Sequence, residues 1–385
     1  MAQIESAWIE LHHHPNSDFD FYRTVLRSSS NVVSPLILAL NHGSSPDAIL
    51  VGRMEESHLD LRLGYARLPQ PRVRAMVFIY GGLLGTPSAM DCQAFGHAIT
   101  GALRHGDADV AIFNHLRADS PLYPVLLRQP GVLVRDHFPS ISIHRQLVLP
   151  ASVDEFWAHL SPKVRGNLRW QMKKFLKVHS QSARIECFSQ PSDVNEMIGQ
   201  MEYVARRTYQ RGLGVGFADQ ASERERLQFK ADRGWLRAYL LYLGGTPCAF
   251  WCGTLYRGVL HSDYLGYDPA FREFSPGIYL IVRTIEEFCK LGPDREVQAI
   301  DFGLGDAKYK ADLANSQWLD ASLCMFAPSL RGIALNACRT PVLLADKVAH
   351  RIAGDSAQGK IKGFWRRLSA RKSAKAEAQN KTEPQ

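Results

Sequence analysis

The sequence predicts an α/β protein of the α+β kind, with two tandem domains that each hold a mixed, mostly antiparallel sheet flanked by helices. Runs with two-residue alternation recur between stretches of helical periodicity, which is typical of this class. Gly-Gly and Arg-Gly pairs between strand-like runs predict tight turns, and hence antiparallel neighbours. The length of 385 residues exceeds what one hydrophobic core normally serves, which indicates more than one domain.

The second half of the chain has this pattern most clearly. Three strands in antiparallel order precede an amphipathic helix and a further strand. Their expected positions are 236–243, 248–256, 259–267, a helix from Ser275, and a strand at 298–302. On the third strand, the two-residue period puts Asp263 on the same face as Leu265 and Tyr267. Its carboxylate is therefore expected either in a cleft or at a solvated edge.

The first 150 residues repeat this order in weaker form. The expected elements are a helix, three strands, a second helix and two strands, at 19–27, 48–54, 59–65, 75–80, 90–104, 110–114 and 142–148. The segment 111–119 follows its helix as 299–306 follows the later one, which indicates a degenerate tandem repeat. The first copy lacks a Ser-Pro-Gly helix start, so we expect it to be structural rather than catalytic.

Four segments are therefore expected. They are a degenerate domain at 1–150, a second domain at 151–327, C-terminal helices at 328–354 and a basic tail at 355–385. Residues 356–385 of this tail carry eight basic and two acidic residues, so they contribute +6 of the formal net charge of +8 and leave the rest of the chain at +2. A nearly neutral body argues against a DNA-binding surface.

The tail also has a short amphipathic pattern. Apolar residues at 361, 364, 365 and 368 fall on one helical face, with lysine and arginine between them. This pattern suits a peripheral contact with an anionic membrane, and a solvated terminus is the alternative.

The most informative feature is the helix start at Ser275-Pro276-Gly277. Proline suits the first helical position, serine can cap the helix, and glycine lets a ligand approach the backbone. The free N–H groups of a helix start attract phosphate, and Arg272 adds a full positive charge. An ordinary well-capped helix is the alternative, and it is the commoner one.

Several short motifs occur in order around this helix. They are Tyr267-Asp268-Pro269, Ser275-Pro276-Gly277, Asp301-Phe302-Gly303, Gly305-Asp306 and Tyr309-Lys310. In their order and spacing, residues 150–325 resemble the GNAT-type acyltransferase domain of the family associated with cellulose and exopolysaccharide biosynthesis, which is related to Fem-type peptidyltransferases. The resemblance implies an acyl-CoA donor, acetyl-CoA above all, held in a splayed sheet. The donor-binding residues that it implies are Tyr264, Gly266, Tyr267, Arg272, Ser275, Gly277 and Ile278.

The resemblance also sets the expected function. It implies N- or O-acyl transfer to an amine or hydroxyl of a sugar or polysaccharide precursor. The stretch 272–277 lacks the glycine-rich Q/R-x-x-G-x-G/A loop of ordinary GNAT enzymes, and some Fem-type relatives take an aminoacyl-tRNA instead. Fem-like aminoacyl or peptidyl transfer, and a non-catalytic scaffold of a polysaccharide synthase complex, are therefore the alternatives.

The loop after the last strand offers the reactive groups. Acyl transfer from a thioester needs a base for the acceptor's proton, an acid for the departing thiolate and donors for the oxyanion. We expect Asp301 or Asp306 as the base and Tyr309 as the acid. Lys308 or Lys310 would steady negative charge. The alternative is that the aspartates cap turns and the lysines are solvated.

A basic helix is expected from Ser161-Pro162, with an apolar stripe between lysines and arginines. The resemblance points to Lys163, Arg165 and Arg169 as contacts for the acceptor or for phosphate, and a solvated face is the alternative.

Cysteine and histidine usage predicts the location and excludes a metal. Seven cysteines without a C-x-x-C pair predict a reducing, cytoplasmic location without disulfides. No ligand spacing predicts a metal site, and the histidine run at 12–14 is expected at the surface. The most apolar stretch, at 76–90, is broken by glycine and proline and is too short to span a bilayer, so any membrane contact is expected to be peripheral.

Overall fold

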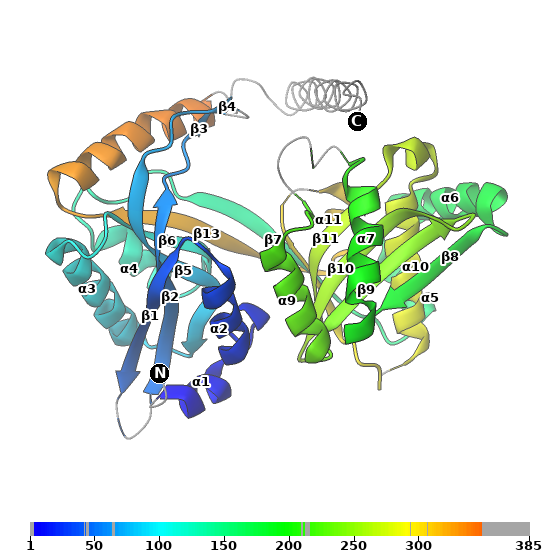
Figure 1. Cartoon of the computed structure of the whole chain (residues 1–385), viewed down its shortest axis with the longest axis horizontal. Coiled ribbons are helices and arrows are strands. Elements are labelled where there is room, and N and C mark those ends of the chain that lie inside the picture. Colours follow the sequence, from blue (N-terminus) through cyan, green and yellow to red (C-terminus); the bar gives the residue numbers. More distant parts are fainter. Residues whose placement is uncertain are drawn as a thin grey trace, which may run out of the picture. The chain divides into compact units, whose positions relative to one another are not determined.

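The structure, a computed structural model, describes residues 4–41, 43, 46–63, 66–208, 211, 216–292, 294–305 and 307–348. Asp306 and the predicted tail at 355–385 lie outside these residues. The described chain forms two compact units (Figure 1). Unit 1 draws on Met1–His144 and Trp318–Gly354, and the described part of unit 2 lies within Arg145–Gln317.

Unit 2 follows the order that the sequence predicts. Its elements are α5 (Val153–His159), α6 (Pro162–His179), β8 (Ala183–Phe188), η3 (Pro191–Asp193), α7 (Val194–Ala205), α9 (Ala221–Asp232), β9 (Leu236–Leu243), β10 (Thr246–Tyr256), β11 (Val259–Tyr267), η4 (Pro269–Phe274), α10 (Pro276–Lys290), β12 (Ala299–Leu304) and α11 (Lys308–Leu313). Two further strands, β7 (Ser140–Val148) and β13 (Ser316–Phe326), have residues in both units. The three predicted strands before the long helix are confirmed.

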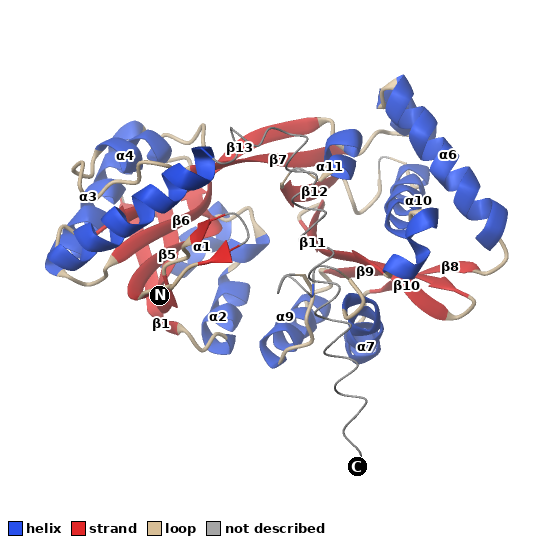
Figure 2. Cartoon of the chain, turned by 90° about the horizontal axis from the view of Figure 1, so that it is seen from above, coloured by secondary structure: helices blue, strands red, loops and turns tan. Residues whose placement is uncertain are grey.

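The unit 2 sheet is covered on both faces. Its strands run in the order β7-β12-β11-β10-β9-β8. One face packs against α5, α6 and α10, where buried side chains such as Phe175, Trp251 and Ile285 form a common core. The other face packs against α7 and α9 around Met201, Leu227 and other apolar side chains (Figure 2). This layering buries the stripe of α10 that the sequence predicts.

The central strands of unit 2 diverge. β11 and β12 are parallel and pair over only three residues of β11, Val259 to His261. Beyond His261, no strand among the described residues lies beside the edge of β11 that faces β12, so backbone groups there lack sheet partners within that part of the chain. Because a parallel pair needs a crossover, α10 lies between the two strands in sequence and begins beside the open end.

A β-bulge interrupts β11 at the point of divergence. In its pairing with β10, Cys252 lies opposite Tyr264 and Gly253 lies opposite Ser262, so Asp263 is the extra residue. The bulge reverses the alternation after this point. The predicted face that joined Asp263 to Leu265 is therefore wrong, because Leu265 packs toward α10 whereas Asp263 contacts α9.

Unit 1 repeats the same plan. Its elements are α1 (Glu5–Leu11), η2 (Pro15–Ser17), α2 (Phe19–Ser28), β1 (Val32–Asn41), β2 (Pro46–His58), β3 (Arg62–Leu63), β4 (Ala66–Arg67), β5 (Arg72–Gly85), α3 (Ala89–His105), β6 (Val110–Arg117) and α4 (Leu122–Arg128), with a helix at 330–348 after β13. Strands run in the order β1-β2-β5-β6-β13. β5 and β6 are parallel and pair over four residues, with α3 between them in sequence. The predicted fold class with two related domains is confirmed.

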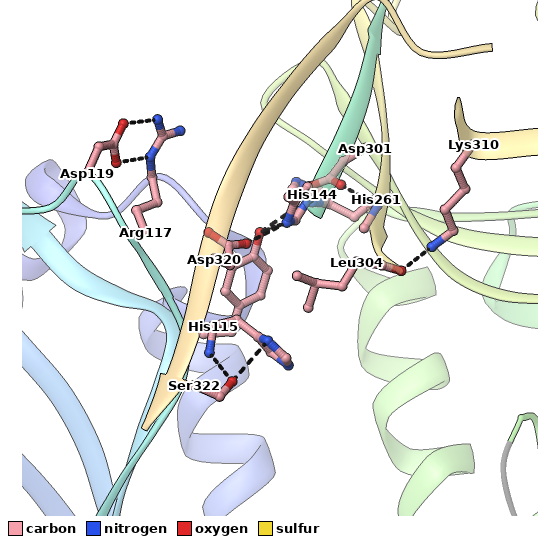
Figure 3. A network of polar contacts seen from close by, with 12 residues as sticks. His115, Arg117, Asp119, His144, His261, Asp301, Leu304, Lys310, Asp320 and Ser322 are labelled. Atoms are coloured by element: carbon pink, nitrogen blue, oxygen red, sulfur yellow. Dashed lines mark hydrogen bonds and ion pairs between the residues drawn. The ribbon is translucent and has the colours of Figure 1, made fainter. Parts of the chain in front are cut away.

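In unit 1, the rings of Tyr80, His14 and His144 occupy the space where β5 and β6 separate. Past the paired residues, Tyr80 contacts His14, the residue before η2, with ring centroids 4.5 Å apart. The Tyr80 hydroxyl also lies 3.2 Å from Nδ1 of His144, and Nδ1 of His144 lies 2.7 Å from Oδ2 of Asp320 (Figure 3). Both members of the His144–Asp320 pair are buried. Side chains of unit 1 itself thus occupy this divergence.

Several expectations for unit 1 need correction. Gly81-Gly82 is not a turn but part of β5, where Gly81 has φ 75° and a Cβ there would lie 2.5 Å from His14. The expected surface position of the histidine run is wrong for His12 and His14, which are buried, and holds for His13, which is exposed. β1 was not predicted. The segment from Trp318 belongs to unit 1, since β13 pairs with β6, whereas the predicted second domain extended to 327.

Within the described ranges, no helix combines the length and the apolar character that crossing a bilayer requires. The predicted membrane contact of the tail concerns residues outside those ranges and stays a prediction.

Candidate active site

A pocket of about 710 Å³ opens in unit 2 where β11 and β12 diverge. Its walls come from both strands, from η4 and the start of α10, and from the loop into α11. The lining residues are Thr208, Ser262, Asp263, Leu265, Gly266, Tyr267, Pro269, Arg272, Ser275, Gly277, Ile278, Phe302, Leu304, Gly305, Ala307, Tyr309 and Lys310. Six of the seven predicted donor-binding residues are among them, and Tyr264 is the exception.

The start of α10 is open to this pocket. Pro276 takes the first helical position, as predicted, but Ser275 does not cap the helix with its side chain, so that expectation is wrong. Ser275 instead adopts a left-handed conformation with φ 52°, and its carbonyl accepts the first intrahelical bond from the Tyr279 N–H. The amides of Gly277 and Ile278 precede that bond and have no intrahelical acceptor. They face a pocket with the positive end of the helix dipole behind them.

The absence of a side chain has different effects at two glycines of the pocket, Gly266 and Gly277. A Cβ on Gly266 would lie 2.5 Å from the ring of Phe250, so packing within the protein excludes a side chain there. A Cβ on Gly277 would meet only Tyr267, at 3.5 Å, which is an ordinary contact. The absence of a side chain at 277 therefore keeps pocket space open rather than relieving a clash in the protein.

The N-terminus of α3, the corresponding helix of unit 1, is capped by side chains at its own start. The Ser88 hydroxyl accepts a bond from the Asp91 N–H, and the Asp91 carboxylate accepts one from the Ser88 N–H. This capping box puts a negative charge on the first turn of α3. An anion would be repelled there, whereas the first turn of α10 carries no acidic residue.

Tyr309 and Lys310 form the wall opposite β11. Both belong to the first turn of α11, and the Tyr309 ring packs edge-on against Phe302 with centroids 6.0 Å apart. The Lys310 ammonium donates a hydrogen bond to the carbonyl of Leu304, with an N–O distance of 2.6 Å (Figure 3). Burial lowers the pKa of Lys310 from its ordinary value, although the nearby Asp301 opposes this shift.

Asp301 lies behind the pocket wall. Its Oδ1 accepts a 2.7 Å hydrogen bond from the Gly303 N–H, and its Oδ2 lies 3.3 Å from Nδ1 of His261 (Figure 3). The side chain is 7% exposed and does not line the pocket. Gly303, in a left-handed conformation with φ 69°, lets the chain turn over this carboxylate. Asp301 thus holds the loop that leads to Tyr309.

The remaining predicted residues lie elsewhere in unit 2. Tyr264 points to the α9 face, where it packs edge-on against Phe217. Lys308 is exposed and pairs with Asp312 on its own helix. Asp306 lies outside the described residues, so its role as a base stays a prediction.

The basic helix α6 does not contribute to the pocket. Lys163 is exposed, the Arg165 guanidinium donates to the carbonyl of Trp157, and Arg169 stacks over the Trp157 ring at 5.2 Å. None of the three lines the pocket between β11 and β12. Their predicted contact with an acceptor is not tested by this geometry.

Sequence reasoning missed the surroundings of Asp263. Asp263 lines the pocket and accepts hydrogen bonds from Lys230 and Thr254, from α9 and β10. A bulge has no reliable sequence signature, so the two-residue period could not predict that Asp263 contacts Lys230 and Thr254. The contact with Lys230 was equally hidden, because α9 was not predicted.

Comparison with known proteins agrees with this geometry. Residues 162–311 match the family model of the acetyltransferase (GNAT) domain, and this range contains every lining residue of the pocket. Unit 2 therefore carries a GNAT acyltransferase domain. No curated protein matches the sequence.

Three solved structures align with most of the chain. FemX has a TM-score of 0.50 at 10% identity, over 85% of this chain and 96% of that chain. L-PGS from Bacillus licheniformis has a TM-score of 0.46 at 12% identity, over 86% and 98%. A tandem GNAT protein from the clavulanic acid biosynthesis pathway has a TM-score of 0.43 at 12% identity, over 85% and 93%. At 10% identity, the likeness to FemX concerns the fold alone.

The two helix starts predict opposite effects of serine replacement on stability. Ser88→Ala removes a capping bond and should lower the free energy of unfolding by about 1 kcal/mol. Ser275→Gly removes no side-chain cap and relieves a left-handed backbone, so it should raise that free energy by about 0.5 kcal/mol. Urea denaturation of each variant measures both values. A loss at Ser275 as large as that at Ser88 would show that the Ser275 hydroxyl does cap α10.

Proposed function

We propose that this protein is an N- or O-acyltransferase that moves an acyl group from acyl-CoA, acetyl-CoA above all, to an amine or hydroxyl of a sugar or polysaccharide precursor. The acyltransferase domain is given by the family match, whereas donor and acceptor are the proposal. The observation that carries it is the uncapped start of α10, which opens into a pocket continuing between two diverging strands.

The proposed donor position follows from the charges along the pocket. The diphosphate of CoA would accept hydrogen bonds from the amides of Gly277 and Ile278. Arg272 lies at the same end, is exposed, and has no ion-pair partner among the described residues. The pantetheine arm carries amide groups, and it would run along the edge of β11 from Tyr267 toward Ser262, where β12 offers no backbone partners.

The transfer step then needs three groups near the thioester. The acceptor nitrogen or oxygen attacks the carbonyl carbon, its proton passes to a base, and the C–S bond breaks as the tetrahedral intermediate collapses. We assign Tyr309 as the acid that protonates the departing thiolate, and the Lys310 ammonium as a charge that stabilises the oxyanion. Both line the pocket opposite β11.

The choice of the base that accepts the acceptor's proton, Asp301 or Asp306, rests on the hydrogen bonds that Asp301 already makes. Asp301 has both oxygens engaged, by the Gly303 N–H and by His261, and it does not line the pocket. Its contacts suit holding the loop more than accepting the acceptor's proton. We therefore favour Asp306 as the base, which stays a prediction from the sequence.

The donor hypothesis predicts a selective loss of CoA binding. Gly277→Leu would fill the space beside the first-turn amides, so the affinity for acetyl-CoA measured by calorimetry should fall at least tenfold. Gly199→Leu is the matched control, because Gly199 is exposed on α7 with nothing near its Cβ position. If wild type binds no CoA or acetyl-CoA but binds an aminoacyl-tRNA, the Fem-like alternative is favoured instead. Binding of neither donor would favour the scaffold.

The acid assignment predicts a loss of turnover without a loss of affinity. Tyr309→Phe keeps the ring contact with Phe302 and removes the hydroxyl, so kcat should fall by about 100-fold. The Kd for acetyl-CoA should stay unchanged. Release of free thiol during acyl transfer gives kcat, and an unchanged kcat would remove Tyr309 from the chemical step.

The lowered pKa of Lys310 predicts an alkaline limit of activity. As pH rises through this pKa, the ammonium is lost at a lower pH than the ordinary value of about 10.4. Lys310→Arg keeps its charge to beyond about pH 12, so the alkaline limb of the kcat profile should move upward by about one pH unit or more. An identical limb in wild type and variant would assign it to another group.

A further inference from the structure

The helix α6 of unit 2 carries charge of a single sign. Its 18 residues include no aspartate or glutamate but six basic residues, which are Lys163, Arg165, Arg169, Lys173, Lys174 and Lys177. The helix α9 of the same unit differs, because its three cations are balanced by three carboxylates. A mixture of both signs is enough to keep a surface soluble, so the charge of α6 needs a separate explanation.

This charge destabilises α6 by itself. Arg165 begins a series of four cations at intervals of four residues, which ends at Lys177, and like charges at this spacing on a helix repel. Lys163 lies in the first turn, where the helix dipole disfavours a cation. Of the six cations, Lys174 is the only one that pairs with a carboxylate of the described residues, that of Glu273 at 3.8 Å. An external anionic partner would relieve this repulsion.

The outer row of α6 holds an exposed tryptophan. On the inner side, Phe175 is buried and stacks on Tyr279 of α10, with ring centroids 3.7 Å apart (Figure 2). The helical period puts Trp170 on the opposite side, where its side chain is 61% exposed. At spacings of three and four, the same row contains Lys163, Gly166, Lys173 and Lys177, all of them exposed. Three lysines thus lie in line with one indole ring.

The exposure of Trp170 leaves a large apolar ring in contact with water. Tryptophan is a mostly buried residue type, because its ring is large and largely apolar. The Lys174 ammonium lies 5.7 Å from the centroid of the Trp170 ring, which leaves the outer side of the ring uncovered. Leu176 and Val178 are also exposed and flank the outer row near the end of α6. Apolar and cationic side chains therefore alternate on one helix surface.

We propose that the outer row of α6 docks on the surface of an anionic lipid bilayer, with the Trp170 ring among the headgroups and the lysines on lipid phosphates. Tryptophan is enriched at membrane interfaces, and a basic helix with exposed apolar side chains is typical of interfacial binding. From Lys163 to Lys177 the row extends over about 21 Å, so it suits an extended anionic surface. This contact goes beyond the proposed acyl transfer, because α6 does not line the pocket between β11 and β12.

RNA is the other extended anionic partner that lysines and a tryptophan suit. Its phosphates would pair with the lysines, and a base would stack on Trp170. Leu176 and Val178 decide between the two, because aliphatic side chains neither stack on bases nor bind phosphate, whereas a bilayer interface takes them out of water. The observations therefore favour lipid.

Sedimentation of the full chain with vesicles tests the role of charge. The probes are vesicles of phosphatidylcholine alone and of phosphatidylcholine with about 30% phosphatidylglycerol, at about 0.1 M salt. We expect wild type to sediment with the anionic vesicles only. The triple variant Lys163→Gln, Lys173→Gln, Lys177→Gln should bind them about tenfold more weakly or less still, because it loses three cations that face the lipid.

A second triple variant is the matched control. It removes the same charge from exposed positions on α2, α3 and α4 and leaves α6 unchanged, with the substitutions Arg27→Gln, Arg104→Gln and Arg128→Gln. Its affinity for the anionic vesicles should stay within about twofold of wild type. Both variants keep the basic tail, so an α6 variant that binds as wild type does would assign binding to another segment and overturn the proposal. Equal losses in the two triple variants would overturn it as well.

Tryptophan fluorescence tests the position of Trp170 directly. When anionic vesicles are added, the emission of wild type should shift to shorter wavelength as the indole leaves water. Trp170→Phe should lose this shift, and Trp170→Ala should weaken binding about threefold or more. The same shift in Trp170→Phe as in wild type would show that the ring stays in water, which would contradict the proposed contact.

The remaining outcomes separate lipid from RNA and from the acyl donor. If wild type does not sediment with the anionic vesicles, the proposal fails, and binding of polyuridylate through the same lysines would identify RNA as the partner. None of these measurements uses an acyl donor or an acceptor. Loss of the proposed function would therefore leave the bilayer contact standing, and failure of the bilayer contact would leave the donor proposal untouched.

Discussion

The early end of the pairing between β11 and β12 is the constraint on which the candidate site depends. Once the two parallel strands stop sharing hydrogen bonds after His261, one edge of β11 has no strand partner in the described part of the chain. The backbone groups of that edge need partners, and a cofactor with amide groups can supply them. The same divergence opens the pocket and brings the start of α10 to its mouth. On the proposed function, side chains such as Tyr309 then add reactivity to a cavity that the backbone has already shaped.

The elements of this site were largely predictable, but their exact surroundings were not. The strands at 236–243 and 259–267 and the helix from Pro276 followed from alternation, glycine turns and proline position, which are local signals. Six predicted donor-binding residues line the pocket because they sit at strand and helix ends that such signals locate. The orientation of Tyr264 was not predictable, because one extra residue in a bulge reverses every later side chain.

Long-range contacts account for the other differences. Asp301 was a reasonable base from its place after a strand, yet its partners are His261, forty residues away, and the Gly303 amide. The pairing of β5 with β2 shifts register between Phe78 and Leu83, and the buried position of His14 depends on this irregular segment around Gly81, which no local pattern of either segment indicates. Neither contact could be predicted from composition, because predicting it requires knowing which strands are neighbours in the sheet. Functional contacts between residues on neighbouring strands are therefore the part of the site that local sequence patterns do not predict.

The capping box of α3 has a consequence for how the duplicated fold is used. Asp91 supplies in unit 1 the negative charge that the start of α10 lacks, and His14, Tyr80 and His144 fill the space between the diverging strands there. Unit 1 thus repeats the scaffold without an open helix start. On the proposed function, each polypeptide would load one donor molecule at a time, and the first copy would be released from catalytic selection to evolve as support.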